Sequence, residues 1–176
     1  MIKKRSVYVL PFAMLLFLSL ITTASTVGTR VDAQSSGPTQ SLTVYIQSLQ
    51  SGNGKLSIVA DEIDWYQGES ANQVFAEREP EAYAEIGGTP DDYYIVNDSD
   101  TLTSFSLADN LAVTMQLFDH TGNAEDLDIH WNEIITPQQF KDAFSNTADV
   151  LDLGQFPYHI TVQDGVITSI VQQYIP

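Results

Sequence analysis

The clearest feature of the chain is a set of segments in which apolar and polar residues alternate. Leu42, Val44 and Ile46 alternate with polar residues, and so do the apolar residues of 111–117. Successive side chains of a strand point to opposite faces, so a period of two predicts half-buried strands. Runs rich in aromatic and β-branched residues predict the remaining strands at 56–65, 93–96, 102–107, 127–131, 158–162 and 166–175.

Turn residues join several of these strands into predicted hairpins. Residues 51–54 (SGNG) and 98–100 (DSD) separate neighbouring strands, and Asp164-Gly165 is typical of a type I′ hairpin turn. The apolar face changes along 56–65, which predicts a β-bulge near Val59. The last strand, 166–175, is apolar on both faces, so we expect it to be covered on both sides.

Two segments have the spacing of helices. Residues 69–79 place apolar side chains on one side, Pro80 ends or restarts the helix, and Gly87-Gly88 closes it. Residues 136–139 (TPQQ) form a capping box with proline at the first helical position, which predicts a second helix.

The elements together predict an α+β fold of about seven short, antiparallel strands and two helices. A small, partly closed β-barrel, OB-like or SH3-like, with helices covering its ends fits this set best. The chain has no cysteine, which excludes disulfides and thiolate metal sites. A domain of this size can bury a core without such crosslinks.

The amino-terminal segment has the pattern of an export signal. Met1–Arg5 is basic, Val7–Ile21 is almost wholly apolar, and small residues precede Ala24 and Ala33. This pattern predicts a secretory signal peptide over 1–33, cleaved after Ala24 or Ala33. We expect a polar linker at 34–40 and a single domain at 41–176. The alternative is an uncleaved anchor that holds the protein to the membrane.

The charge of the chain is strongly negative. Seven Lys+Arg stand against 23 Asp+Glu, a formal net charge of −16. After removal of 1–33 the balance is 3 − 22 = −19. Binding to phosphates needs clustered cations, so this composition argues against a nucleic-acid partner and against contact with anionic lipid after signal cleavage. It favours cations and basic partners, unless the charge serves only to keep the protein in solution.

Aromatic residues are the first candidates for a ligand site. Trp65, Tyr66, Tyr93, Tyr94 and Trp131 could line a groove for a carbohydrate or a peptide, and Trp65, Tyr93 and Tyr94 are our candidate ligand-binding residues. Aromatic residues on strands also serve as core and as cross-strand pairs. Tyr93 and Tyr94 are adjacent, so they point to opposite faces and at least one meets the core.

An oxygen-rich loop is the candidate metal site. Residues 119–128 (DHTGNAEDLD) could hold calcium through Asp119, Asn123, Asp126 and Asp128. The loop fails as an EF-hand, because Ala124 stands at the glycine position and a histidine replaces the final glutamate. The three histidines of the chain have no metal-ligand spacing.

Catalytic motifs are absent from the sequence. There is no G-x-S-x-G element and no phosphate-binding glycine loop, so we predict no cofactor. Paired carboxylates could support glycoside hydrolysis, but 22 acidic residues produce such pairs by chance.

Three stretches resemble a known pattern. They are Trp65–Ala71 (WYQGESA), Asp92–Asn97 (DYYIVN), and the tail from Pro157 to Tyr174, which reads P-Y-x-I, D-G and Q-Y. Their order resembles a group of uncharacterised secreted proteins and lipoproteins of Gram-positive bacteria. The resemblance implies export and gives no functional residue. This chain lacks the lipobox cysteine of some members.

These observations favour a secreted, non-enzymatic binding module that interacts with an unidentified partner at the cell envelope. A small secreted hydrolase that uses carboxylates is the first alternative. A cation-binding module is the second.

Overall fold

The computed structural model describes residues 38–146 and 150–176. The expected signal peptide lies outside the described residues. The elements are β1 (Thr39–Gly52), β2 (Lys55–Gln67), α1 (Glu69–Arg78), α2 (Pro80–Ile86), β3 (Tyr93–Val96), β4 (Leu102–Leu117), β5 (Ile129–Ile135), α3 (Pro137–Ser145), β6 (Pro157–Gln163) and β7 (Val166–Gln172). Short 3₁₀ turns lie at Ala124–Asp126 and Leu153–Gln155. β1 begins at Thr39, inside the segment that we expected to be a linker.

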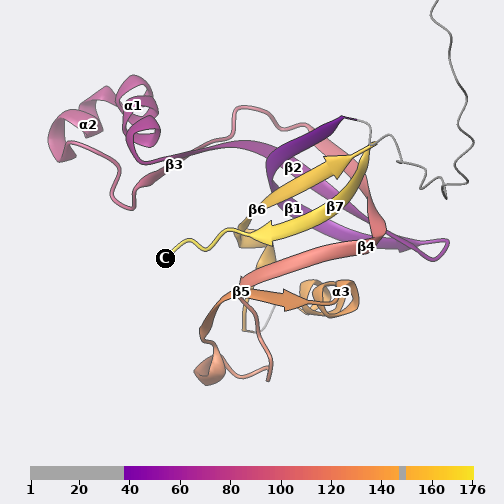
Figure 1. Cartoon of the computed structure of the whole chain (residues 1–176). Coiled ribbons are helices and arrows are strands. Elements are labelled where there is room, and N and C mark those ends of the chain that lie inside the picture. The colour runs from indigo at the N-terminus through magenta and orange to yellow at the C-terminus, as the bar shows by residue number, and fades with distance from the viewer. Residues whose placement is uncertain (1–37, 147–149) are drawn as a thin grey trace, which may run out of the picture. The chain divides into compact units, whose positions relative to one another are not determined.

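Five strands pair in a closed ring, and Figure 1 shows them wrapped into a barrel. Around the ring the order is β1, β2, β4, β7 and β6, and β6 pairs again with β1. Every pairing is antiparallel except that of β4 with β7. Counted along the chain, the barrel strands follow the order 1-2-3-5-4, which is that of an OB-type barrel. The predicted class of a small α+β barrel is confirmed.

The barrel is held by an apolar interior and by tight hairpins. Its most buried residues, each at most 1% exposed, are Val44, Ile46, Ile58, Ala60, Val113, Met115, Tyr158, Ile160, Ile167 and Ile170. Asp164 and Gly165 join β6 to β7 with φ of 53° and 78°, so both central residues are left-handed, as a type I′ turn requires. This hairpin prediction is confirmed.

The expected hairpin of 93–96 with 102–107 does not form. β3 pairs with residues 64–67 of β2, while Leu102–Ser106 of β4 pair with residues 57–61. Both segments therefore pair with β2, one after the other along its length. The two strands predicted at 102–107 and 111–117 are two parts of the single strand β4. The first part pairs with β2, and the later part pairs with β5 and β7.

The predicted bulge near Val59 lies in the partner strand. Ile46 pairs with Ala60 and Ser48 pairs with Val59, so the extra residue is Gln47 of β1. The ladder is irregular at the expected level, but β2 keeps its alternation there.

The last strand is not covered on both sides in the way its sequence indicated. Between Thr161 and Val162 the β6–β7 register slips by one residue, at Thr168. The slip turns both Ile167 and Ile170 into the barrel core, where each is 0% exposed. Ile167 and Ile170, which a regular strand would place on opposite faces, thus both point inward on either side of a bulge, while Val166 and Val171 are half-buried.

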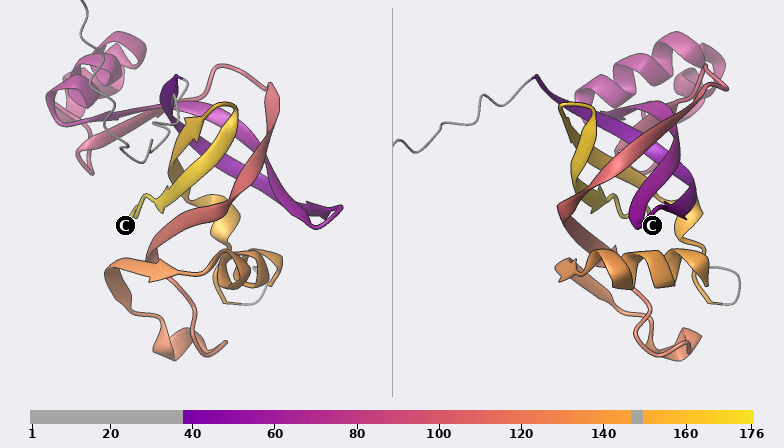
Figure 2. Two further views of the ribbon diagram at one scale, coloured as in Figure 1. Left: turned by 45° about the vertical axis from the view of Figure 1, so that its right-hand side comes forward. Right: turned by 90° about the vertical axis from the view of Figure 1, so that its right-hand side faces the viewer.

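The helices occupy two places. Pro80 restarts the first helical segment, so α1 and α2 are separate, and Gly87 ends α2 in the left-handed conformation with φ 79°. They lie beside β3 and the end of β2, while α3 lies across one end of the barrel (Figure 2). Phe140 of α3 is 0% exposed and belongs to the barrel core. Within the described residues, no helix is long and apolar enough to cross a membrane.

Candidate functional site

Aromatic side chains gather on the outer face of β2. Ile58 and Ala60 point into the barrel, so the regular alternation of the strand places Ile63 and Trp65 on the outside. The Trp65 ring stacks on Tyr93 of β3, with the centroids 4.7 Å apart and the planes 12° from parallel. Both residues are half-buried. Such a pair stabilises its arrangement by roughly 1 kcal/mol beyond the area it buries.

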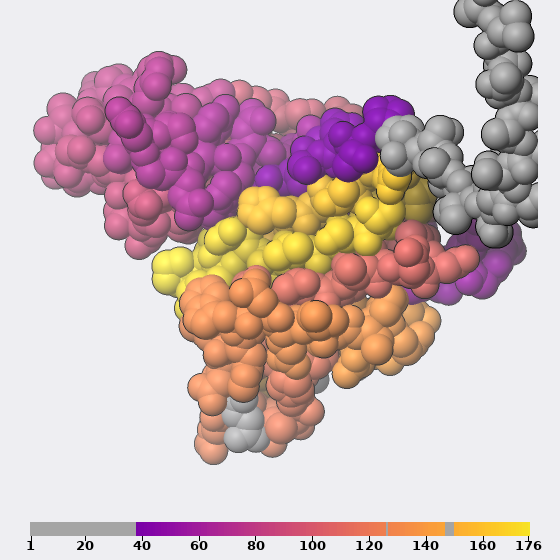
Figure 3. All heavy atoms as spheres, viewed as in Figure 1, coloured from indigo at the N-terminus to yellow at the C-terminus, as the bar shows by residue number. Residues whose placement is uncertain are grey.

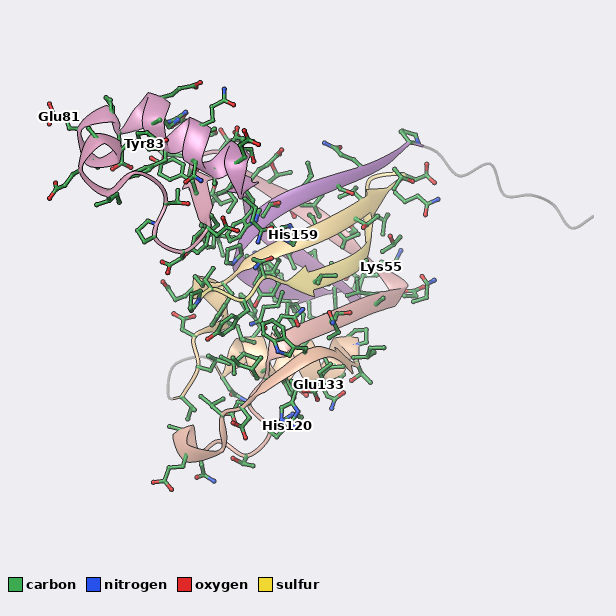
Figure 4. The ribbon with its side chains drawn as sticks, turned by 60° about the vertical axis from the view of Figure 1, so that its left-hand side comes forward. Lys55, Glu81, Tyr83, His120, Glu133 and His159 are labelled. Carbon is green, nitrogen blue, oxygen red and sulfur yellow. The ribbon has the colours of Figure 1, made fainter. Side chains whose placement is uncertain are left out.

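A histidine of β6 lies beside this pair. The His159 ring meets Trp65 edge-on at 6.2 Å, and Figure 4 shows it on the outside of the barrel. Gln173 donates its side-chain NH₂ to the Tyr174 carbonyl, so its Oε1 accepts from His159 Nε2 at 3.1 Å. The Thr43 hydroxyl then donates to Nδ1 at 3.0 Å. The hydrogen-bond network therefore assigns a fixed ring with its proton on Nε2.

Tyr45 extends the group along β1. Burial and the neighbouring Tyr93 raise the pKa of Tyr45, so the Tyr45 hydroxyl stays neutral at neutral pH. Asp61 is the partner of Tyr45 in the β1–β2 ladder. One of its carboxylate oxygens accepts from Asn97 at 2.8 Å, and the other is buried with no hydrogen-bond partner among the described residues. We call Tyr45, Trp65, Tyr93 and His159 the outer aromatic cluster.

Tyr94 lies apart from this cluster. Its ring packs against Phe75 of α1 at 5.5 Å, and its hydroxyl donates to Glu79 at 2.5 Å. That hydrogen bond raises the pKa of Tyr94. Of the three residues predicted to bind a ligand, the structure brings Trp65 and Tyr93 together and directs Tyr94 to the helices.

Sequence reasoning did not single out Tyr45 or His159. His159 is 94 residues from Trp65 in the chain (159 − 65), and only the barrel brings β6 beside β1. The alternation along β1 contained one signal of this surface, because Thr43 and Tyr45 share a face that is more polar than the core face. The partner strand of that face could not be known from the pattern.

A cavity of about 390 Å³ lies beside α3 at the end of the barrel. Its walls include Phe118, Asp119, His120, Gln139, Asp142 and Leu153. His120 Nε2 lies 3.1 Å from a carboxylate oxygen of Glu133, and Figure 4 shows the two side chains facing each other. The cavity therefore combines an apolar base with carboxylates and an oriented imidazole.

The acidic groups of this cavity already have local partners. Asp119 Oδ1 accepts from the backbone N–H groups of Thr121 at 3.0 Å and Gly122 at 2.7 Å. Asp142 accepts from the Gln138 side chain at 2.8 Å. Asp119 thus stabilises the loop that follows β4.

The predicted calcium residues lie in the loop that follows β4. In the part of the chain that the structure describes, no group of three or more His, Asp or Glu side chains is arranged to hold a metal ion. Asp119 is committed to its backbone contacts, and the side chain of Asp126 lies outside the described part. Calcium binding through Asp119, Asn123, Asp126 and Asp128 remains a prediction.

The fold and site define a five-stranded β-barrel with an aromatic cluster on its outer face and a polar cavity at one end. Comparison of the chain with family models, curated proteins and solved structures finds no match.

Proposed function

We propose that this protein is an exported, non-enzymatic binding module of the cell envelope, and that its ligand contacts the outer aromatic cluster. The observation that carries the proposal is the Trp65–Tyr93 stack on the outside of the barrel. The barrel core is complete without these rings, since it is filled from the inward face of each strand. Outward rings held in a fixed arrangement are typical of surfaces that bind sugars or peptides.

The polar groups around the rings support the same function. His159 is held by hydrogen bonds on both ring nitrogens, which fixes its ring beside Trp65, and the half-buried Asp61 adds a carboxylate to the same face. A ligand with donor groups and an apolar face would complete such a surface. Residues 61–100, which include this part of β2 and all of β3, carry twelve acids and one base. The ligand is therefore neutral or basic, because a polyanion would be repelled.

The test is binding of the mature protein to isolated envelope fractions, polysaccharide and protein separately. Trp65→Ala and Tyr93→Ala should each weaken binding at least tenfold. Trp131→Ala is the matched control, since it removes the other tryptophan of the chain at a distant strand. Equal binding by all three variants would refute the cluster as the ligand surface. Circular dichroism should confirm that each variant is folded.

Export is the second part of the proposal. It rests on the basic and apolar segments of 1–21 and on the small residues before Ala24 and Ala33. Amino-terminal sequencing of protein from the medium should begin at Ser25 or Gln34. Intact Met1 on most of the exported material would favour an anchored protein instead.

A second candidate function is hydrolysis in the cavity beside α3. It is favoured by one observation, that Asp119, His120 and Asp142 line the same space. A carboxylate hydrolase would lose turnover in Asp142→Asn and keep its fold, whereas the binding module would keep its ligand affinity in that variant. Assays against glycan and peptide substrates separate the two functions.

A further inference from the structure

The cavity beside α3 has an apolar base and a polar rim. Phe118 and Leu153 form the base, and they are only 7% and 2% exposed. Polar residues that reach solvent form the rim, among them His120, Asp142 and Asn146. Figure 3 shows the loop after β4 and α3, both in orange, at the surface at this end of the barrel. The volume of about 390 Å³ lies within the range of small-molecule sites.

The walls of the cavity carry negative charge that no base balances. Asp119 and Asp142 both line it, and no Lys or Arg among the described residues forms an ion pair with either. Their hydrogen bonds come from backbone N–H groups and from Gln138, which are neutral donors and leave both charges in place. His120 is paired with Glu133, so this pair adds no net positive charge in either protonation state of the histidine.

The chain around the cavity is acidic as well. Residues 118–153, which supply all the wall residues, contain eight acids and one base. The base is Lys141, which precedes Asp142 on α3 and is not a wall residue. Consecutive residues of a helix point about 100° apart, which separates the Lys141 side chain from the cavity. The electrostatic field in the cavity therefore attracts cations and repels anions.

We propose that this cavity binds a small organic cation. The apolar body of the ligand packs against Phe118 and Leu153, and its ammonium group lies at the rim beside Asp119 and Asp142. A bare metal ion would gain nothing from the apolar base, whereas an ammonium group on an apolar body uses both parts of the cavity. The site is separate from the outer aromatic cluster, and binding there requires no bond to be broken, so the proposal depends on neither function proposed above.

The experiment is a titration of the mature protein, followed by ¹H–¹⁵N correlation spectra, with three probes of one shape: 2-phenylethylammonium, 2-phenylethanol and phenylacetate. The ammonium probe should shift the backbone amides of 118–122 and 139–146 until they saturate. The neutral probe should bind roughly tenfold more weakly, because it lacks the charge, and the anionic probe should leave these amides unchanged. Equal binding of the three probes, or no saturable shift at these amides, would overturn the proposal.

Asp142→Asn tests the charge at the rim. It should weaken binding of the ammonium probe roughly fivefold and leave binding of the neutral probe unchanged. Glu77→Gln is the matched control, because Glu77 of α1 accepts from the side chain of Gln73, four residues before it, just as Asp142 accepts from Gln138. This control should bind the ammonium probe like the wild type. Equal affinity of the two variants for that probe would contradict the site.

Trp65→Ala separates this site from the outer aromatic cluster. The variant loses the stacked pair and should still bind the ammonium probe with wild-type affinity. Loss of the ammonium shifts in this variant would place the probe at the cluster and overturn the proposal for the cavity. Unchanged binding of Trp65→Ala to envelope fractions would instead refute the cluster as the ligand surface and leave the cavity result intact.

Discussion

The side chain of Gln172 takes the place of a strand partner for Gln116. Its Oε1 accepts the backbone N–H of Gln116 at 2.9 Å and that of Leu117 at 2.8 Å. Gln172 is 1% exposed, and the β4–β5 register is irregular at this level. Two backbone donors that the bulge leaves without a strand partner are thus satisfied by one buried amide.

Gln172→Leu should therefore lower the free energy of unfolding by about 3 kcal/mol, because two buried donors lose their acceptor. Chemical denaturation measures the change. Gln50→Leu serves as the control, since Gln50 is exposed on β1, and it should change stability little. A small effect of Gln172→Leu would mean that water or a shifted backbone replaces the amide.

The capping box of α3 gives a second prediction. Thr136 Oγ1 accepts from Gln139 N at 3.1 Å, and Thr136 N donates to Gln139 Oε1 at 2.9 Å. Thr136→Ala should destabilise the domain by roughly 1 kcal/mol. Gln138→Ala, one position before Gln139, removes only an exposed contact with Asp142. It should lower the free energy of unfolding by only a few tenths of the value for Thr136→Ala. Equal denaturation midpoints for the two variants would contradict the role of the cap.

The buried hydroxyl of Tyr158 predicts a loss of stability in alkali. Burial raises the pKa of Tyr158, and its hydroxyl donates to the Leu153 carbonyl at 2.9 Å. The unfolded chain loses this proton near pH 10 while the folded chain keeps it, so the unfolded state then binds fewer protons. The free energy of unfolding should fall as pH rises above 10.

Tyr158→Phe separates this effect from those of other groups. The variant should lose about 1 kcal/mol at neutral pH, because the Leu153 carbonyl loses its donor. It should also show a shallower decline above pH 10 than the wild type. Parallel declines of the two proteins would show that other groups govern the alkaline transition.

The negative charge of the chain predicts a salt effect. Self-repulsion weakens a compact globule, and about 0.1 M salt screens exposed charges beyond roughly 10 Å. The melting temperature should rise smoothly with sodium chloride. Calcium at millimolar concentration should add no more than magnesium does. A calcium-selective rise that disappears in Asp126→Asn and Asp128→Asn would instead establish a calcium site in the loop 119–128.

The sequence by itself determined the local structure well. Alternation marked the strands, Asp164-Gly165 fixed a hairpin, and the residues after Thr136 fixed the start of α3. These features depend on neighbours within a few residues, where turn chemistry, capping and side-chain period act directly. The barrel class followed from the number and length of these elements.

Long-range pairing was decided only by the tertiary structure. The sequence indicated a hairpin between β3 and β4, but both segments pair with the long strand β2 instead. The same holds for the candidate site. Trp65 and Tyr93 were visible in the sequence as aromatic residues on strands, whereas His159 joins them because barrel closure pairs it with Thr43. Register and closure depend on the whole set of strands, so no local pattern contains them.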